Sequence, residues 1–147
     1  MTADPRLRGH LQRALAHEMG AVQLYLAQAS LAEMWGLEEH GRRFRRDGVD
    51  ELTHVELIIQ RMLVVGMTPN SGNVAPVRLG RSIEEMLLID RELEVEAIHA
   101  YDDAARYSAR IGDGGTEELF VRLLGEEMEH LGSIDQTLAD LAGRGSS

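Results

Sequence analysis

The stretches DELTHVE (residues 50–56) and GEEMEHL (residues 125–131) each contain a glutamate followed three residues later by a histidine. The pairs are Glu51 with His54 and Glu127 with His130. Because residues three apart on a helix are separated by about 60° around its axis, each glutamate shares a face with its histidine. Both stretches show helical apolar periodicity, so the sequence carries the same polar helix face twice.

A single Glu-x-x-His pair is weak evidence for a metal site, because such pairs also occur by chance. A third pair is present at Glu96 and His99. The first two differ from it because they belong to a repeat with an offset of 76 residues. Its members are Glu18 and Glu94, Tyr25 and Tyr101, Asp50 and Glu126, Glu51 and Glu127, and His54 and His130. Glu96 lies about 200° around the helix from Glu94 and is expected to point outward. Chance is therefore a poor explanation for the two pairs in register.

Helix signals divide the chain into four segments. Asp4 before Pro5 is a helix start, and Ser82 with Glu85 forms a capping box. Gly66 is a helix end with a proline shortly beyond it. We expect helices at about residues 5–35, 38–65, 83–111 and 117–142, with Thr116 capping the last, in a single domain of residues 1–147. The tail from residue 143 is too short and polar to form a packed element.

Residues 67–81, MTPNSGNVAPVRLGR, show no helical periodicity. Fully extended, a loop of this length spans about 50 Å, whereas the second expected helix is about 42 Å long. The loop can therefore run the length of a bundle and start the third helix at the end where the second began. The prediction is an all-α four-helix bundle with one long crossover, the topology of ferritin-like bundles.

Six residues of the repeat fall near the middle of their helices and are candidate metal ligands. They are Glu18, Glu51, His54, Glu94, Glu127 and His130. Four carboxylates buried at one level cost many kcal/mol unless they are neutralised, and two divalent metal ions would bring the charge near zero. This ligand set is known from di-iron and di-manganese bundles. Carboxylate and imidazole ligands suit iron or manganese, and the absence of cysteine excludes thiolate sites.

At these residues the chain resembles bacterioferritin, and the resemblance extends over nearly the whole sequence without gaps. Further matching motifs are Tyr25, WGL at residues 35–37, GMTPN at residues 66–70 and EEML at residues 84–87. The resemblance implies that the six residues bind two iron ions per chain as a ferroxidase centre. It also implies that Glu51 and Glu127 bridge the irons, that each histidine caps one iron, and that Tyr25 lies close enough to donate an electron.

Three departures from the family pattern affect the expected function. Leu52 replaces the usual haem-ligating methionine, so we expect no haem there, and Met19 is a poor substitute. Arg46 replaces the histidine of the family's inner-surface iron site, although Asp50 is retained. The family's short fifth helix has no counterpart before Ser147, so a dimer, a cage or a mixed assembly all stay open.

Tyr101 is an addition to the family pattern and has two interpretations. It is either a buried packing tyrosine whose hydroxyl bonds to a ligand, or a second redox-active tyrosine. We therefore retain Tyr25 and Tyr101 as candidate catalytic residues. The remaining histidines lie outside the repeat and are expected at the surface: His10, His17, His40 and His99.

The net charge of −10 argues against nucleic acid as a partner and is compatible with cations. No apolar run is long enough to span a membrane, and the first residues show no signal core, so a cytoplasmic location is expected. The expected partners are iron ions and oxygen or peroxide, in a homo-oligomer.

The predicted function is a di-iron ferroxidase that oxidises Fe(II) to Fe(III) for iron storage or detoxification. A rival hypothesis is a di-iron oxidase or peroxidase that retains its metals and forms no mineral. A second rival is a subunit of a mixed ferritin assembly, and a third is a metal-free interaction bundle.

Overall fold

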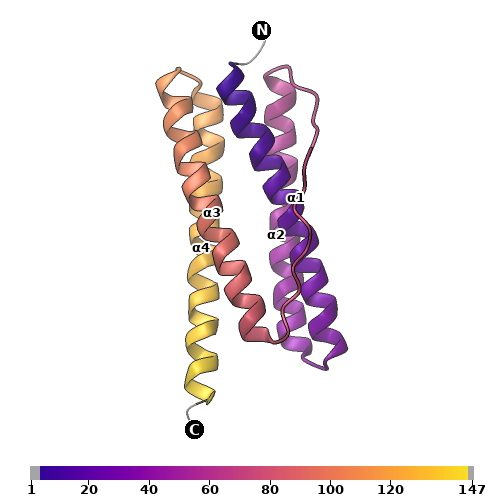
Figure 1. Cartoon of the computed structure of the whole chain (residues 1–147). Helices are drawn as coiled ribbons and strands as arrows, with labels where there is room; N and C mark the ends of the chain where they lie inside the picture. Colours follow the sequence, from indigo (N-terminus) through magenta and orange to yellow (C-terminus); the bar gives the residue numbers. More distant parts are fainter. Residues whose placement is uncertain (1–3, 146–147) are drawn as a thin grey trace.

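The computed structural model describes residues 4–145, and this part of the chain forms four helices and no strand. They are α1 (Pro5–Met34), α2 (Glu38–Val64), α3 (Ile83–Arg110) and α4 (Gly114–Gly145). The helices pack side by side in an elongated bundle, in which α1 with α2 and α3 with α4 form antiparallel hairpins (Figure 1). The predicted all-α four-helix fold is confirmed.

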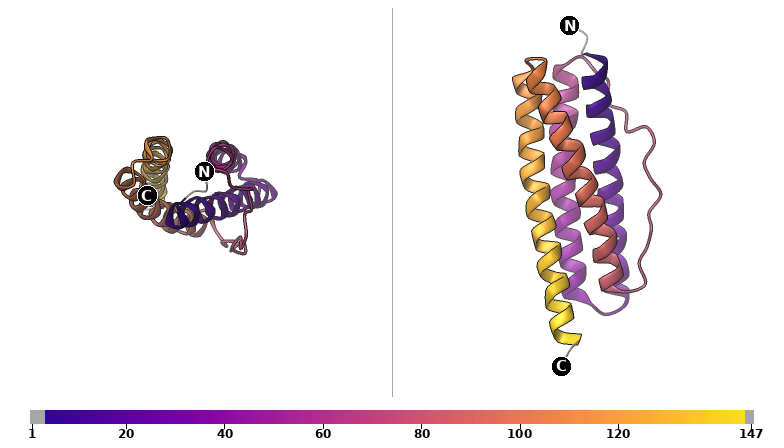
Figure 2. Two further views of the ribbon diagram at one scale, coloured as in Figure 1. Left: turned by 90° about the horizontal axis from the view of Figure 1, so that it is seen from above. Right: turned by 60° about the vertical axis from the view of Figure 1, so that its left-hand side comes forward.

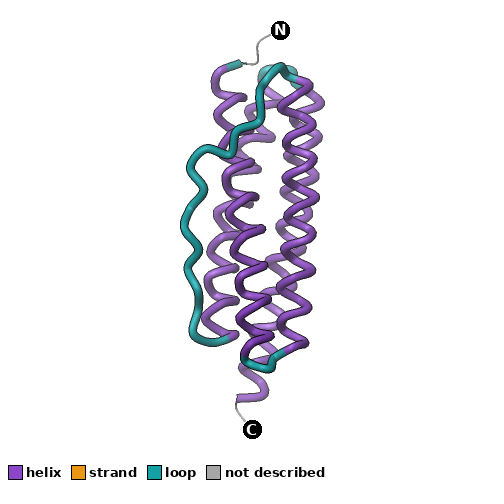
Figure 3. The backbone as a smooth tube through the Cα atoms, turned by 90° about the vertical axis from the view of Figure 1, so that its right-hand side faces the viewer, coloured by secondary structure: helices purple, strands orange, loops and turns teal. Residues whose placement is uncertain are grey.

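The segment between α2 and α3 crosses from one end of the bundle to the other along its outside (Figures 2 and 3). It covers residues 65–82, close to the predicted 67–81. Val74 packs onto α1, where a Cβ added at Gly20 would meet its Cγ1 at 3.6 Å. Because of this crossover, α2 and α3 run in the same direction, and the second hairpin starts at the end where the first one turns.

The predicted starts of α1 and α3 are confirmed by their capping bonds. The Asp4 carboxylate accepts hydrogen bonds from the backbone N–H groups of Arg6 and Leu7, at 2.9 and 3.2 Å. Ser82 Oγ accepts from the N–H of Glu85 at 3.1 Å, and only this half of the predicted capping box is present among the described residues. These bonds satisfy N–H groups that have no partner within the helix.

The predicted start of α4 at residue 117 is wrong by three residues. The Asp113 carboxylate accepts the N–H of Thr116 at 3.0 Å, so Asp113 rather than Thr116 caps the helix. Arg61 of α2 fixes this turn by donating to Asp113 at 2.8 Å and to Thr116 Oγ1 at 2.9 Å. The helix also continues to Gly145, beyond the predicted end at 142, so residues 143–145 of the predicted tail belong to α4.

The predicted end of α2 at Gly66 is confirmed to within one residue. Gly66 has φ of +82°, and the following N–H, of Met67, donates to the carbonyl of Met62 at 2.8 Å. This is the left-handed helix stop that glycine adopts without strain. Elsewhere, Gly48 brings α2 close to α1, since an added Cβ would lie 3.3 Å from Tyr25 Cβ.

The apolar core is divided into two clusters by a layer of buried polar residues. The cluster nearer the start of α1 includes Leu11, Ile58, Met62, Tyr101, Phe120 and Leu123. The cluster nearer the end of α1 includes Tyr25, Phe44, Met86, Leu87 and Ile134. Glu18, Glu51, Glu94 and Glu127 lie between them and are 0% exposed. Burial of each large apolar side chain stabilises the fold by about 1.5–3 kcal/mol, and these two clusters hold the layer in place.

A second buried polar contact joins α1 to α3 within the cluster that contains Tyr25. Gln28 Nε2 donates to Asp90 Oδ1 at 2.7 Å, and both side chains are almost completely buried. Burial raises the pKa of Asp90 to about 8; the bond from Gln28 opposes this shift, and the charge of Asp47 adds to it. Asp90 therefore carries a proton at neutral pH, when an exposed aspartate would be ionised.

Asp90→Asn should stabilise the metal-free protein at pH 8 and have a much smaller effect at pH 5. A carboxyl whose pKa is raised on folding stabilises fully below its unfolded value of 3.8, and this contribution is lost as the pH rises toward about 8. Asparagine removes the titration, so the melting temperature at pH 8 should rise by roughly 5 °C or more. Thermal unfolding across this pH range tests it, with the exposed Asp103→Asn as the control; equal shifts at both pH values would contradict it.

Candidate metal centre

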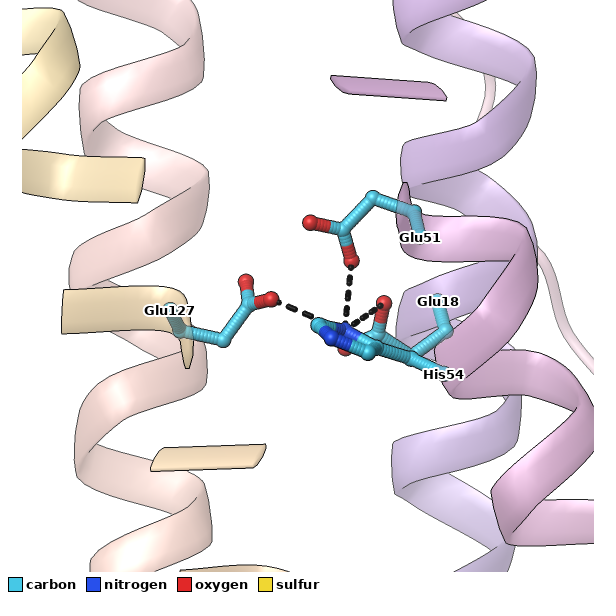
Figure 4. Close-up of side chains that lie close together, drawn as sticks. All are labelled: Glu18, Glu51, His54 and Glu127. Atoms are coloured by element: carbon cyan, nitrogen blue, oxygen red, sulfur yellow. Dashed lines mark ion pairs between the residues drawn. The ribbon is translucent and has the colours of Figure 1, made fainter. Parts of the chain in front are cut away.

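The polar layer is built from one residue or one pair on each helix. α1 contributes Glu18 and α3 contributes Glu94, while α2 and α4 each contribute a Glu-x-x-His pair. Glu51 and His54 project from α2 toward Glu127, which reaches across from the opposite hairpin (Figure 4). The structure therefore brings the six predicted residues together, although they come from segments more than 100 residues apart in the sequence.

The first half of the layer is centred on the His54 imidazole. Its Nδ1 lies 3.5 Å from Glu18, 3.3 Å from Glu51 and 3.0 Å from Glu127 (Figure 4). One ligand atom from each of these four residues lies within 4.8 Å of the others. This spread is small enough for one ion to be bound by all four.

The second half is centred on His130 and mirrors the first. Its Nδ1 lies 2.8 Å from Glu51, 3.6 Å from Glu127 and 3.9 Å from Glu94. These four residues also offer ligand atoms within 4.8 Å of one another. Glu51 and Glu127 belong to both groups, which is the arrangement expected of two carboxylates that bridge neighbouring metal ions.

The six residues fit a pair of divalent ions chemically as well as geometrically. Eight of their buried nitrogen and oxygen atoms have no hydrogen-bond partner among the described residues. They are Glu18 Oε2, both oxygens of Glu51 and of Glu127, Glu94 Oε2, and the Nδ1 atoms of His54 and His130. Buried polar atoms are almost always satisfied in folded proteins, so eight lone-pair donors directed into one volume indicate a metal site.

Outer carboxylates hold the far side of both imidazoles. The Nε2 of His54 contacts Glu126 at 2.9 Å, and the Nε2 of His130 contacts Asp50 at 3.3 Å. A carboxylate on one ring nitrogen fixes the ring and its tautomer, so that Nδ1 is left free to bind a metal. Each outer carboxylate belongs to the opposite hairpin from the histidine it holds. The repeat had shown that Asp50 and Glu126 correspond, but this contact needed the structure.

Two tyrosines make the same crossed contact with the remaining carboxylates. The Tyr25 hydroxyl donates to Glu94 Oε1 at 2.5 Å, and the Tyr101 hydroxyl donates to Glu18 Oε1. Burial and the facing carboxylate raise the pKa of both hydroxyls well above the usual value. Both tyrosines therefore stay protonated and act as hydrogen-bond donors.

In the metal-free layer, protons neutralise part of the negative charge of the four carboxylates. Burial and the Glu18 carboxylate raise the pKa of Glu51 well above its usual range. Burial and contact with Glu127 do the same for the pKa of Glu94. Both side chains therefore favour the neutral acid more strongly than an exposed glutamate does.

The histidines and Glu127 form the charged part of the layer. Burial lowers the pKa of His130, but contacts with Glu127 and Glu51 outweigh it and raise the value to about 11. The pKa of His54 is raised for the same reasons, chiefly by Glu127. Burial raises the pKa of Glu127, but its contacts with Glu94, His130 and His54 reverse the direction and lower it. Two imidazolium ions thus face a carboxylate that stays ionised.

A third acidic group adjoins the layer through His130, and its member Asp47 was missed by the sequence analysis. Asp47, Asp50 and His130 place ligand atoms within 4.8 Å of one another, and Asp50 is exposed. Asp47 lies one helical turn before Asp50 and could have been found from that spacing. Arg46, which occupies the position of the family's histidine, is exposed.

Other expectations for polar residues were met unevenly. Glu96 and His99 are exposed, as predicted for the third pair. His10, His17 and His40 are half-buried rather than fully at the surface. The ring of His17 packs edge-on against Tyr101 at a centroid distance of 6.2 Å.

Comparison with known proteins agrees with this geometry. The ferritin-like domain profile matches residues 8–143, nearly the whole chain. The chain belongs to the ferritin-like family. The bacterioferritin of Brucella melitensis biotype 1 is 29% identical to this ferritin-like chain over 142 residues, 97% of the chain and 88% of the relative. The bacterioferritins of Rhodobacter capsulatus and Streptomyces coelicolor are 29% and 28% identical, over 95% and 94% of this chain and 86% and 83% of theirs. The predicted resemblance to bacterioferritins is confirmed.

Within the described part of this ferritin-like chain, no helix combines the length and apolar character needed to cross a bilayer. Leu52 is 54% exposed on α2, outside the polar layer.

Metal binding to the ferritin-like layer should release protons at pH 7, because the ions bind only deprotonated ligands. The imidazolium groups of His54 and His130 supply two per chain, and any proton held by Glu51 or Glu94 adds to them. The apparent affinity should therefore increase with pH. Calorimetric titration with Co(II) in buffers of different ionisation enthalpy measures the number of protons, and binding without proton release would contradict the assignment.

Proposed function

We propose that this chain is a di-iron ferroxidase that binds two Fe(II) ions per chain and oxidises them to Fe(III) with oxygen or peroxide. The observation that carries the proposal is the pair of four-residue donor groups that share Glu51 and Glu127. Membership of the ferritin-like family supports it. The proposed role is iron storage or detoxification, in the cytoplasm.

The donor set accounts for the proposed metals and their charge. Four carboxylates and two imidazoles favour iron or manganese over metals that prefer thiolate. The bridging residues Glu51 and Glu127 would hold the two ions close together, and Glu18 and Glu94 would each bind one. When bound, the metal pair supplies the electrons, while the protein sets the geometry and excludes water. Tyr25 and Tyr101 are the candidate catalytic side chains next to it.

A metal-retaining di-iron oxidase or peroxidase is the second candidate, and Arg46 favours it. A guanidinium group at this surface position repels cations and works against the movement of iron from the centre to a mineral.

Neither candidate needs a mixed assembly. Homo-oligomerisation is proposed because several apolar side chains of α1 and α2 are exposed: Met19, Leu26, Val49 and Leu52.

Addition of Fe(II) in air to the metal-free protein tests this function. Two ions per chain should be oxidised rapidly, as followed by Fe(III) absorbance. If excess iron is also oxidised and elutes with a large assembly from a sizing column, the chain stores iron. If oxidation stops at two ions per chain, or the excess precipitates away from a small oligomer, the metal-retaining oxidase is supported instead.

The double variant Glu51→Gln, Glu127→Gln should lose rapid oxidation because it removes both shared carboxylates. The rate should fall by at least about 100-fold, since the loss of even an outer partner of a metal ligand costs about 10- to 100-fold. Glu96→Gln is the matched control, because it changes the glutamate of the exposed third pair. Unchanged iron content and oxidation in the double variant would refute the site.

We also propose that the chain binds no haem in the position used by bacterioferritins, because the Leu52 side chain has no lone pair to offer iron. Protein produced with an ample haem supply should therefore lack the strong absorbance band of haem near 400 nm. A band that persists after gel filtration, at a fixed ratio to protein, would contradict this expectation.

A further inference from the structure

The metal position around His54 has one carboxylate that it does not share, and the two oxygens of this carboxylate have different surroundings. Glu18 belongs only to the group around His54. Its Oε1 accepts a hydrogen bond from the hydroxyl of Tyr101, which comes from α3. Its Oε2 has no hydrogen-bond partner among the described residues and lies 3.5 Å from His54 Nδ1 (Figure 4). One oxygen is thus held by the tyrosine, and the other faces the metal position.

The ring of Tyr101 lies between aromatic neighbours from two other helices. His17 of α1 packs edge-on against it at a centroid distance of 6.2 Å, and the ring of Phe120 of α4 lies 5.7 Å away. The whole side chain is 1% exposed. Because the ring has little freedom to move, its hydroxyl is directed at Glu18 without a further loss of side-chain entropy when metal binds.

A buried carboxylate that binds metal through one oxygen needs a donor for the other. In a dry core, an oxygen without a donor carries a desolvation cost that no water molecule can remove. The hydrogen bond from Tyr101 removes this cost and also determines which oxygen of Glu18 faces the layer. Outer partners of this kind orient the ligands of metal sites and increase their affinity.

We propose that Tyr101 is a positioning residue that sets the metal affinity of the His54 position, by holding Glu18 so that Oε2 binds the ion. It acts on this position alone, because the unshared carboxylate of the other position, Glu94, is held by Tyr25 at 2.5 Å. This inference deepens the proposed metal centre and rests on the proposed function in that respect. Tyr101 keeps its proton and its electrons throughout.

The competing interpretation is that Tyr101 only fills the core. Its ring would then be the important part, and its contacts with His17 and Phe120 would be retained by phenylalanine. Tyr101→Phe removes the hydroxyl and leaves the ring, so it separates the two interpretations.

The experiment measures Co(II) binding in two variants that each retain one metal position. Glu94→Gln disables the position around His130, and Glu18→Gln disables the position around His54. Both glutamine side chains can still accept the hydrogen bond of a tyrosine. Tyr101→Phe is then added to each variant, and titration followed by visible absorbance gives the dissociation constant of the remaining Co(II).

The hydroxyl should matter in only one of the two variants. In the Glu94→Gln protein, Tyr101→Phe should raise the dissociation constant by about 10- to 100-fold. In the Glu18→Gln protein, Tyr101→Phe should leave the constant unchanged. Tyr25→Phe should show the reverse pattern. In the otherwise wild-type protein, Tyr101→Phe should weaken one of the two ions and leave the other.

Two comparisons distinguish positioning from a general structural effect. Tyr107→Phe should change neither constant, because this hydroxyl bonds to Asp4, away from the layer. A distortion of the bundle would weaken both positions together, since they share Glu51 and Glu127.

The proposal is overturned if Tyr101→Phe leaves the dissociation constant unchanged or lower in the Glu94→Gln protein, or if it weakens binding equally in both variants. A wild type that binds no Co(II) would overturn the metal centre itself. A wild type that shows the expected pattern but oxidises no Fe(II) would support the role of Tyr101 and overturn the ferroxidase function alone.

Discussion

Neutralisation of four buried carboxylates is the constraint on which the rest of the structure depends. Glu18, Glu51, Glu94 and Glu127 are 0% exposed in the middle of an apolar bundle, where unpaired negative charge costs several kcal/mol per group. In the metal-free protein, two imidazolium ions and the raised pKa of Glu51 and Glu94 help to meet this demand. Two divalent ions would neutralise the carboxylates equally well, because the same carboxylate and imidazole atoms would bind metal in place of protons. The layer is therefore an ion-exchange site enclosed by two apolar clusters, and the bundle must be long enough to supply both.

The contacts around the layer connect the two hairpins. From the first hairpin, Tyr25 contacts Glu94 and Asp50 contacts His130. From the second hairpin, Tyr101 contacts Glu18 and Glu126 contacts His54. Each hairpin thus orients the side chains of its partner. A shift of one hairpin along the other would break these four contacts at once. The polar layer consequently fixes the register of the bundle, which apolar packing between helices specifies less strictly.

The sequence was sufficient to predict most of the fold and the residues of the polar layer. Apolar periodicity and capping residues are local signals, and the repeat with an offset of 76 residues marks the corresponding positions of the two hairpins. It failed at the start of α4, where Asp113 and Thr116 are both good capping residues and the capping bond is made by Asp113. Arg61 of another helix donates to both residues, a long-range contact that the local sequence does not reveal. It also could not predict the crossed contacts of Tyr25 and Tyr101, which depend on how the hairpins face each other. The contact between Gln28 and Asp90 was missed for the same reason, because neither residue is unusual in its own helix.

The crossover between α2 and α3 carries no residue of the polar layer, and each hairpin brings three of the six donors. Two identical hairpins could therefore build a similar layer, but symmetry would force the two metal positions to be the same. Joining the hairpins in one chain removes that restriction, and the two positions do differ. The His130 side chain is 14% exposed and stands beside Asp47 and Asp50, whereas the His54 side chain is 3% exposed. One position thus lies nearer to solvent than the other, a difference between the two metal positions that a symmetric pair of hairpins could not have.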